Sequence, residues 1–447
     1  MRLSENQVRA LAARVVAMTP ADEAEVLVTS NDAALTRFAG NRIHQNVAEE
    51  NTTVSVRAVL GKRTGVAGTN RLDDDALRTC CEAAVAAARV APADDGFPGL
   101  PAPAPFERAE RGCESTRAFD ADARARAAAA IIEQSAFRGL SAAGTVGRSD
   151  YAVAVANSKG VDAAMGVTAL KATVLSSGTD GGSGWASWLG RDANDFAPEA
   201  LGDEAASIAE RSADPGSLDA GTYAVVLAPE AVSDLLDFLG YLAFGARAVD
   251  EKSSFIAGHI GEKLLSECIT LTENALGAET VGLTFDFEGS PKHAVPLIEA
   301  GVVRGPVTDS YWAAKLGLSN TGHALPAPNS YGPLPMNLEL AAGDTRVDEM
   351  IAGVTRGLYV TRFHYVNVED PLRVVLTGMT RDGTFMIEDG RLTKPVKNVR
   401  FTQSVVDALA DVEAVGDRRA LIGPEEGGAN LAPALLIAKW AVTGQTR

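Results

Sequence analysis

Residues 221–272 read GTYAVVLAPEAVSDLLDFLGYLAFGARAVDEKSSFIAGHIGEKLLSECITLT, and the rest of the chain is organised around this stretch. The β-branched, apolar run at 223–227 predicts a strand. Pro229 predicts the first position of a helix, where its missing N–H would be unpaired anyway, and Glu230 suits the positive end of the helix dipole. Apolar residues then recur at helical spacing and predict one buried face: Val232, Leu235, Leu236 and Leu239.

Composition narrows the class of protein. The chain has 447 residues, of which 46% are hydrophobic and 22% charged, so it is long enough for two globular domains. A formal net charge of −17 argues against a broad nucleic-acid surface or an anionic membrane surface, because both select clustered Lys and Arg. No apolar run reaches transmembrane length and no secretory signal opens the chain, so we expect a cytoplasmic protein. The four cysteines have no metal-type spacing, and we interpret them as buried free thiols: Cys80, Cys81, Cys113 and Cys268.

The first half of the chain combines strand-like segments with alanine-rich helices. Ser4 and Gln7 have the spacing of a capping box at a helix start. Turn signals, such as SND at 30–32, divide the next stretch into expected strands at 24–29, 33–38, 42–49, 52–60 and 63–67. Helices are expected at 73–90, 119–137 and 198–213, and the Gly-rich residues 178–184 are expected to form a flexible loop.

From Ser217 onward the strand-like segments become shorter and helices fewer. We therefore expect an α+β fold with two domains. Residues 1–215 would form a curved antiparallel sheet with helices. Residues 216–447 would form a β-rich domain that carries the helix at 229–243.

The order of strand, PEA-started helix, SSF loop and GEKLLSECITL resembles the TldD/PmbA family, once called modulators of DNA gyrase. Further short matches, such as those at 36–45, 157–160 and 335–340, spread the resemblance over nearly the whole chain. In the metal-bearing branch of that family the helix begins His-Glu-x-x-x-His, with two zinc-binding histidines and a Glu that acts as general base. Here residues 229–234 read PEAVSD, so Pro229 and Asp234 occupy the histidine positions and Glu230 is the positional remnant of the base.

The resemblance implies the metal-free branch. The family's third zinc ligand is a cysteine near the C-terminus, whereas the last cysteine here is Cys268. We therefore expect no catalytic residue, metal ligand or cofactor in this chain, and zinc in a metal-bearing TldD-like partner. The pair would be a heterodimeric metalloprotease that acts on unfolded or short peptides, although a homodimer is also open. The alternatives are an autonomous hydrolase with a non-standard site and a non-catalytic scaffold protein.

Two further sites are open from the residues alone. None of the five histidines lies four residues from another, so a metal site would have to be assembled from distant loops, with His293, His323 and His364 as candidates. The segments 320–331 and 361–366 mix polar and aromatic residues, and they would hold an extended peptide by strand pairing if they line a groove. The residues we expect at such a groove are His323, Tyr331, Arg362 and His364.

Overall fold

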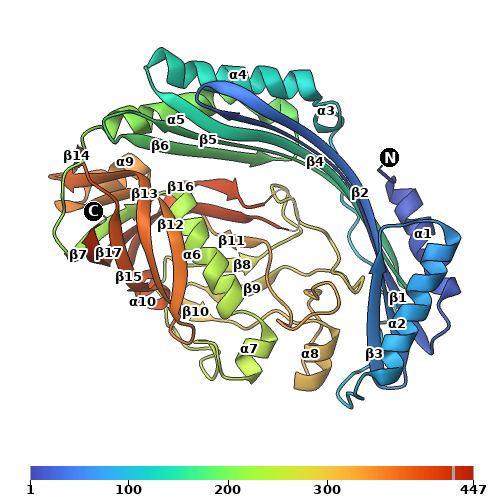
Figure 1. The fold of residues 1–447 in the computed structure, drawn as a ribbon. Coiled ribbons are helices and arrows are strands. Elements are labelled where there is room, and N and C mark those ends of the chain that lie inside the picture. The colour runs from blue at the N-terminus through green and yellow to red at the C-terminus, as the bar shows by residue number, and fades with distance from the viewer. Residues whose placement is uncertain (1, 425–427, 446–447) are drawn as a thin grey trace.

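The computed structural model describes residues 2–424 and 428–445, which form two sheets and the helices around them (Figure 1). The first half of the chain contains α1 (Glu5–Met18), β1 (Glu23–Ala39), β2 (Arg42–Leu60), β3 (Arg63–Thr69), α2 (Asp74–Val90), α3 (Glu114–Arg117), α4 (Ala121–Phe137), β4 (Ser141–Asn157), β5 (Asp162–Ser177), β6 (Ser183–Gly190), the 3₁₀ turn η1 (Ala193–Asp195) and α5 (Pro198–Arg211).

The second half contains β7 (Gly221–Leu227), α6 (Pro229–Leu242), α7 (Ala246–Asp250), β8 (Leu271–Glu273), β9 (Val295–Glu299), β10 (Val302–Val303), α8 (Ser310–Leu316), β11 (Leu338–Leu340), α9 (Val347–Ala352), β12 (Arg356–Asp370), β13 (Val375–Glu388), β14 (Arg391–Pro395), β15 (Val399–Ser404), α10 (Val405–Ala410), β16 (Val412–Ile422) and β17 (Asn430–Gln445). The α+β class expected from the sequence is confirmed. Within the described residues no helix is both long and apolar enough to cross a membrane.

The first six strands form one antiparallel sheet in the order β3-β2-β1-β4-β5-β6. The predicted break at residues 30–32 was wrong, because β1 continues through them and pairs with β2 and β4 along its length. Ser30 lies opposite Thr52, and their hydroxyl oxygens are 2.8 Å apart. Hydrogen bonding to a strand on each side outweighs the local turn preference of these polar residues.

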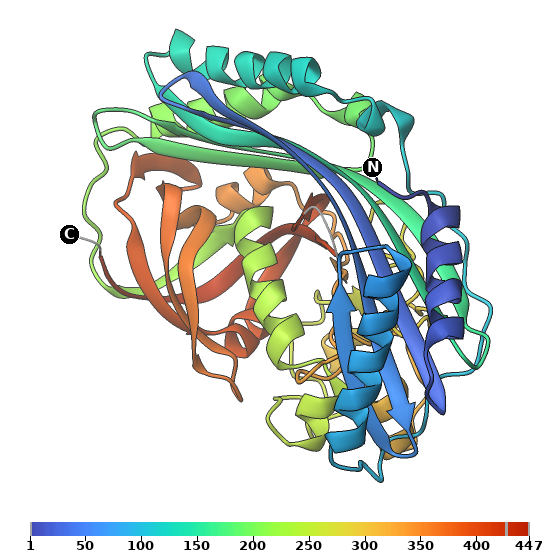
Figure 2. The ribbon, with the colours of Figure 1, turned by 45° about the vertical axis from the view of Figure 1, so that its right-hand side comes forward.

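The first sheet curves over the second half of the chain (Figures 1 and 2). Helices α4 and α5 cover its outer side at one end, and α1 and α2 cover it at the other. Helix α1 begins with the predicted capping box, in which Ser4 and Gln7 exchange hydrogen bonds between side chain and backbone. The concave side of the sheet therefore faces the second half of the molecule.

The second sheet contains a closed ring of strands. β17 pairs with β7 and β15, β15 pairs with β13, β13 with β12, and β12 with β7, which closes the circuit. Aromatic side chains fill part of its core, where the Phe363 and Trp440 rings stack with centroids 5.3 Å apart. The expectation of shorter strands holds for β8 to β11 but was wrong for β12, β13 and β17, which span 15, 14 and 16 residues because they form this ring.

The cysteines are all free thiols, as expected. Cys80 and Cys81 are buried on α2, and burial raises the pKa of the Cys80 thiol to about 11. Cys113 is half-buried and Cys268 is exposed, so the expected burial was wrong for Cys268. It lies in the loop before β8, outside any regular element that would bury it.

Candidate functional site

The start of α6 lies where the two halves of the molecule meet. Pro229 occupies the first turn directly after β7, as predicted, and Ala228 precedes it as the N-cap residue. The helix packs its apolar face against β12 and β17. Glu230 and Asp234 are one helical turn apart and share a side of α6. Glu230 contacts β6 of the first sheet, so this side of the helix faces the first half of the chain.

Strand β6 forms the other wall of this site. The sequence predicted a flexible loop over residues 178–184, but β6 begins at Ser183 and pairs with β5. A Cβ on Gly184 would lie 2.1 Å from the backbone carbonyl oxygen of Ala205 in α5, so glycine is required for this close approach of strand and helix. Ser183, Trp185 and Ser187 alternate along β6 and therefore share one face.

Glu230 is held by a hydrogen bond across the seam between the two halves. The Ser187 hydroxyl donates a short hydrogen bond to Oε1 of Glu230. Burial raises the pKa of the Glu230 carboxyl, while the Ser187 hydrogen bond, Arg362 and Lys171 act in the opposite direction. One carboxylate oxygen is thus engaged, and the group does not behave like an exposed helix-start carboxylate.

Arg362 of β12 is the cation nearest to this helix start. Its Nε lies 3.0 Å from Oδ2 of Asp382 in β13, and its guanidinium carbon lies 4.1 Å from the centre of the Trp185 ring. Asp382 is 3% exposed and accepts a 2.8 Å hydrogen bond from the Ser183 hydroxyl of β6. Ion pair, ring contact and hydrogen bond together join β6 to β12 and β13.

Asp234 also has a strongly raised pKa on this side of α6. Burial, together with the nearby carboxylates of Asp237 and Glu230, raises its pKa to about 7, while Arg362 and the backbone N–H of Phe363 act to lower it. Asp237, one turn further on, accepts a 2.6 Å hydrogen bond from the Asn430 side-chain amide. The Asp234 carboxyl at the start of α6 is therefore partly protonated near neutral pH.

The residues at this helix start do not fit zinc. A zinc site needs three or four N, S or O ligands, whereas Pro229 has no ligating side chain and an oxygen of Glu230 is already bonded to Ser187. The guanidinium of Arg362 would also repel a metal cation here. Across residues 2–424 and 428–445, no group of three or more His, Cys, Asp or Glu residues has the arrangement of a metal site.

The predicted groove residues lie in three different places. His323 has no exposed side-chain surface, and its Nε2 lies 3.3 Å from Oε1 of buried Glu273. Arg362 and His364 lie on β12 near the start of α6, where burial lowers the pKa of His364. Tyr331 is 58% exposed, and its ring centroid lies 5.8 Å from that of Tyr241, near the end of α6.

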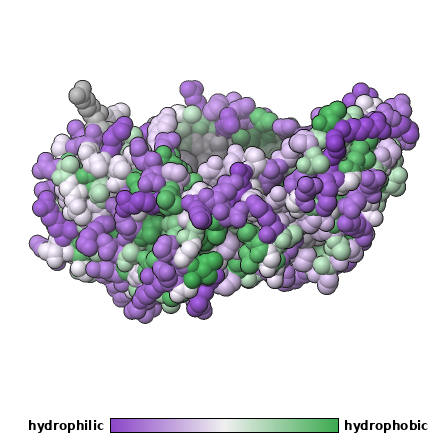
Figure 3. All heavy atoms as spheres, turned by 90° about the horizontal axis from the view of Figure 1, so that it is seen from below, coloured by the Kyte–Doolittle hydropathy of each residue, from purple (hydrophilic) through white to green (hydrophobic). Residues whose placement is uncertain are grey.

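One of the two predicted groove segments lines a cavity. Most of the residues from 324 to 332 border a cavity of about 780 Å³ between the two halves. Tyr311 and Trp312 of α8 and Arg57 of β2 also line it. The other predicted segment, 361–366, does not contribute to this cavity. The view from below shows hydrophobic residues gathered near the middle of that face among hydrophilic ones (Figure 3).

Sequence reasoning missed the partners that Glu230 and Arg362 find on β6 and β13. Ser187, Trp185 and Asp382 are separated from them by 20 to 177 residues along the chain, and only the packing of the two sheets brings them together. A local signal for β6 was available, because aromatic residues such as Trp185 and Trp188 are enriched in strands.

Comparisons with known proteins agree on one family. Residues 220–444 match the model of the PmbA/TldA metallopeptidase C-terminal domain, and residues 24–88 match that of PmbA/TldA metallopeptidase domain 1. The chain is 30% identical over 179 residues to a metalloprotease TldD homolog of Haemophilus influenzae, covering 38% of this chain and 36% of that protein. It is 27% identical over 255 residues to metalloprotease PmbA of Escherichia coli O157:H7, covering 56% and 53%. The matched part is therefore about half the length of these relatives or less.

Solved structures share the fold over nearly the whole chain. TldE from Thermococcus kodakarensis superposes with a TM-score of 0.88 at 20% identity, covering 97% of this chain and 99% of that one. A protein of Thermotoga maritima described as a modulator of DNA gyrase superposes with a TM-score of 0.85 at 19% identity, with the same coverage. At these identities the likeness concerns the fold alone.

Proposed function

Because this chain belongs to the PmbA/TldD metallopeptidase family, we propose that it is the non-metal subunit of a two-chain metalloprotease that acts on peptides. A metal-bearing family member would supply zinc and the general base. This chain would complete the enclosure in which peptides are held. A second copy of this chain is the other partner that the test must consider.

The start of α6 is the observation that supports this proposal most directly. Its residues have the family's helix position without the family's metal ligands, since Pro229 and Asp234 stand where histidines would be needed. Glu230 remains, but Ser187 occupies one of its oxygens and Arg362 lies nearby. A general base has to reach a metal-bound water or a substrate proton, and here the carboxylate is instead used to join the two halves of the chain.

The cavity of about 780 Å³ is our candidate for the part that holds a peptide. It lies between the two halves, and its lining combines aromatic side chains with polar ones, as peptide-binding sites do. Tyr311 and Trp312 would contact apolar side chains of a peptide, and Asn329 would serve its backbone groups. Arg362, His364 and Tyr331 remain candidates for contacts with the partner or with a peptide that extends beyond the cavity.

One observation favours a second function, that of an autonomous hydrolase. The Asp234 carboxyl has a pKa of about 7 and lies one turn from Glu230, whose pKa is also raised. A general acid or base works best when its pKa is near the working pH. Such a pair would act on a substrate proton without a metal.

The deciding experiment compares the chain alone with a mixture. We would purify the chain without chelators, measure its metal content by elemental mass spectrometry, and assay hydrolysis of an unfolded protein with and without a metal-bearing family member. The proposal expects near-zero zinc, no hydrolysis by the chain alone, and hydrolysis by the mixture. Stoichiometric metal in the chain alone, or a mixture whose rate does not depend on this chain, would refute it.

Matched variants separate the two candidate functions. Helix α5 also begins with Pro and Glu, at Pro198 and Glu199, so Glu199→Gln is a control for Glu230→Gln. If the chain is an autonomous hydrolase, its own activity is lost in Glu230→Gln or Asp234→Asn and kept in Glu199→Gln. If it is the non-metal subunit, none of these changes alters the zinc content of the mixture.

A further inference from the structure

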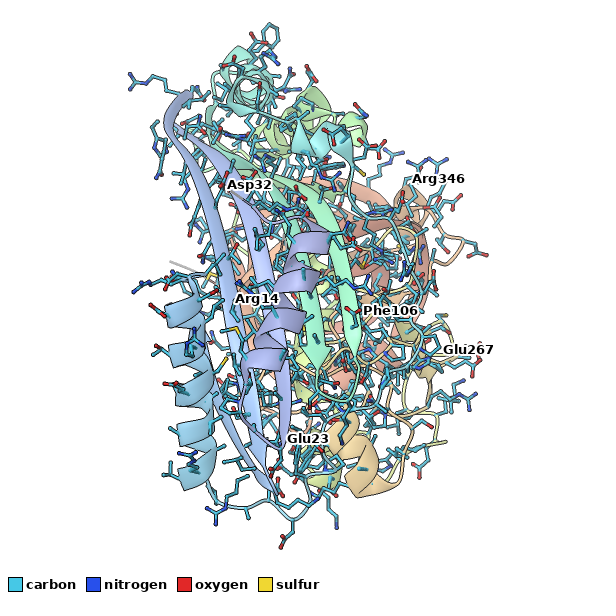
Figure 4. The ribbon with its side chains drawn as sticks, turned by 90° about the vertical axis from the view of Figure 1, so that its right-hand side faces the viewer. Arg14, Glu23, Asp32, Phe106, Glu267 and Arg346 are labelled. Carbon is cyan, nitrogen blue, oxygen red and sulfur yellow. The ribbon has the colours of Figure 1, made fainter. Side chains whose placement is uncertain are left out.

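A second cavity lies on the outer side of the first sheet, away from the start of α6. Its volume is about 720 Å³, within the usual range for small-molecule sites. The start of α1, residues 106–112 and β5 form most of its wall. Figure 4 faces this side and shows α1 crossing the outer face of the sheet, with Phe106 nearby.

Charge sets this cavity apart from the rest of the chain. Although the formal net charge is −17, arginines outnumber carboxylates in the lining. The carboxylates are Glu5, Glu110 and Asp162. The arginines are Arg2, Arg9, Arg108, Arg111 and Arg117.

Two of these arginines have strong partners within the protein. Arg9 forms a two-pronged ion pair with Asp162, through N–O distances of 2.7 and 2.5 Å. Arg111 is 3% exposed and donates hydrogen bonds of 2.8 to 3.2 Å to four backbone carbonyl oxygens between residues 275 and 282. The charge of Arg9 is thus balanced by Asp162, and the guanidinium of Arg111 is occupied by backbone carbonyls.

The other three arginines have capacity left. Arg2 and Arg117 share the single carboxylate of Asp150, at 2.8 and 3.3 Å, which leaves one positive charge uncompensated. Arg117 also lies 3.6 Å from Glu114, but that carboxylate is 85% exposed and such pairs are weak in water. Nε of Arg2 is buried and finds no hydrogen-bond acceptor within the described part of the chain. Arg108 is exposed, and no ion pair or hydrogen bond forms on its side chain in that same part.

The start of α1 adds a further source of positive potential. Glu5 and Asn6 line the cavity with the first turn of this 14-residue helix. The capping box takes up the N–H of Gln7, whereas the earlier N–H groups of a first turn have no acceptor inside the helix, and with the helix dipole they favour an anion. On the apolar side, Phe106 and Met165 give the wall a surface for a non-polar group.

We propose that this cavity binds a small organic anion, held by Arg2, Arg108 and Arg117 and by the first turn of α1. The recognised chemistry is a phosphate or carboxylate group, both of which accept paired hydrogen bonds from guanidinium. The site is separate from the start of α6, and the inference does not depend on the proposed peptidase role.

The test is calorimetric titration of the full chain at low ionic strength with two probes, inorganic pyrophosphate and citrate. We expect saturable one-to-one binding of at least one probe, and the tighter probe identifies the anionic group. Arg108→Ser and Arg117→Ser should each weaken binding at least tenfold. The control is Arg346→Ser, because Arg346 is exposed, pairs with Asp348 and does not line this cavity.

Three results would overturn the inference. They are the absence of binding by both probes, equal loss of affinity in the Arg346 control, and unchanged affinity in Arg108→Ser. The Arg108 variant decides the matter even if Arg117→Ser folds poorly, because Arg108 is exposed and its side chain makes no hydrogen bond or ion pair with the described residues. Circular dichroism of each variant verifies the fold.

Discussion

Replacing Asp234 by asparagine should stabilise this protein above neutral pH and leave its stability unchanged in mild acid. The two side chains have nearly the same shape, and asparagine still offers an oxygen to the backbone N–H of Phe363, which interacts with Asp234 in the native chain. The substitution therefore removes a charge with little change in packing. The substitution removes the energetic cost of a buried charge beside Asp237 and Glu230.

The size of the effect follows from the pKa. In the folded chain the pKa of Asp234 is raised from 3.8 to about 7, so between these values the native state holds a proton that the unfolded chain has lost. The free energy of unfolding must then fall as pH rises through this window, and it is constant above it. A difference of about three pKa units has a ceiling of about 4 kcal/mol, at 1.36 kcal/mol for each unit. Because Asp234 is partly solvated, we expect about 1–2 kcal/mol.

The assay is urea denaturation of both proteins at pH 4 and pH 8, followed by fluorescence. The variant should have the higher midpoint at pH 8 and an equal one at pH 4. Asp348→Asn is the control, since that exposed carboxylate is paired with Arg346 and its loss should shift the midpoint little at either pH. A variant no more stable than the native chain at pH 8, or one stabilised equally at both pH values, would show that the buried Asp234 charge does not lower the free energy of unfolding.

Three other substitutions test buried polar contacts. Arg362→Met leaves the buried carboxylate of Asp382 with only its longer ion pair, 3.7 Å from Arg381, and should lower the free energy of unfolding by about 2–4 kcal/mol, measured by denaturation. Arg111→Met deprives four carbonyl oxygens of their donor, and hydrogen exchange of residues 275–282 should speed up by at least about tenfold while that of β1 stays unchanged. Despite burial, Lys292 and other neighbours hold the pKa of Glu273 at about 2. The stability that the Glu273 carboxylate contributes is therefore present above its ordinary pKa of 4.5 and is lost as pH falls toward 2. Glu273→Gln should destabilise the chain at pH 7 and flatten the acid branch of the thermal stability profile, and an unchanged branch would contradict this.

Local pattern was sufficient for much of the fold. The strand and helix at 223–242, the helices at 73–90 and 198–213, and the capping box at Ser4 follow from periodicity and end signals, and the structure confirms them. The strand breaks in the first sheet were wrong because residues 30–32 hydrogen-bond to strands on both sides, which no short window of sequence contains. The predicted loop at 178–184 overlapped the first two residues of β6, because Gly184 serves close packing against α5 and not a turn.

The candidate site was only half accessible from sequence. The substitution of the histidine positions by Pro229 and Asp234 was visible in the chain. The Ser187 hydroxyl on Glu230, and the pKa of Asp234, depend on how a strand of one sheet meets a helix on the other. Residue types predicted the absence of metal ligands, whereas the contacts of Glu230 and Asp234 are visible only in the packing.

The ring of strands in the second half constrains how the protein is made. β7 lies between β12 and β17, and its Leu227 pairs with Leu435, which the ribosome adds about 200 residues later. At a synthesis rate of about 5–20 residues per second, β7 and the apolar face of α6 remain without β17 for roughly 10–40 s. The first sheet involves only residues up to 190, so all of its strands are synthesised before β7. In nascent chains the first half should therefore be folded while the second half still exposes apolar residues. We expect chaperones to bind the second half during synthesis.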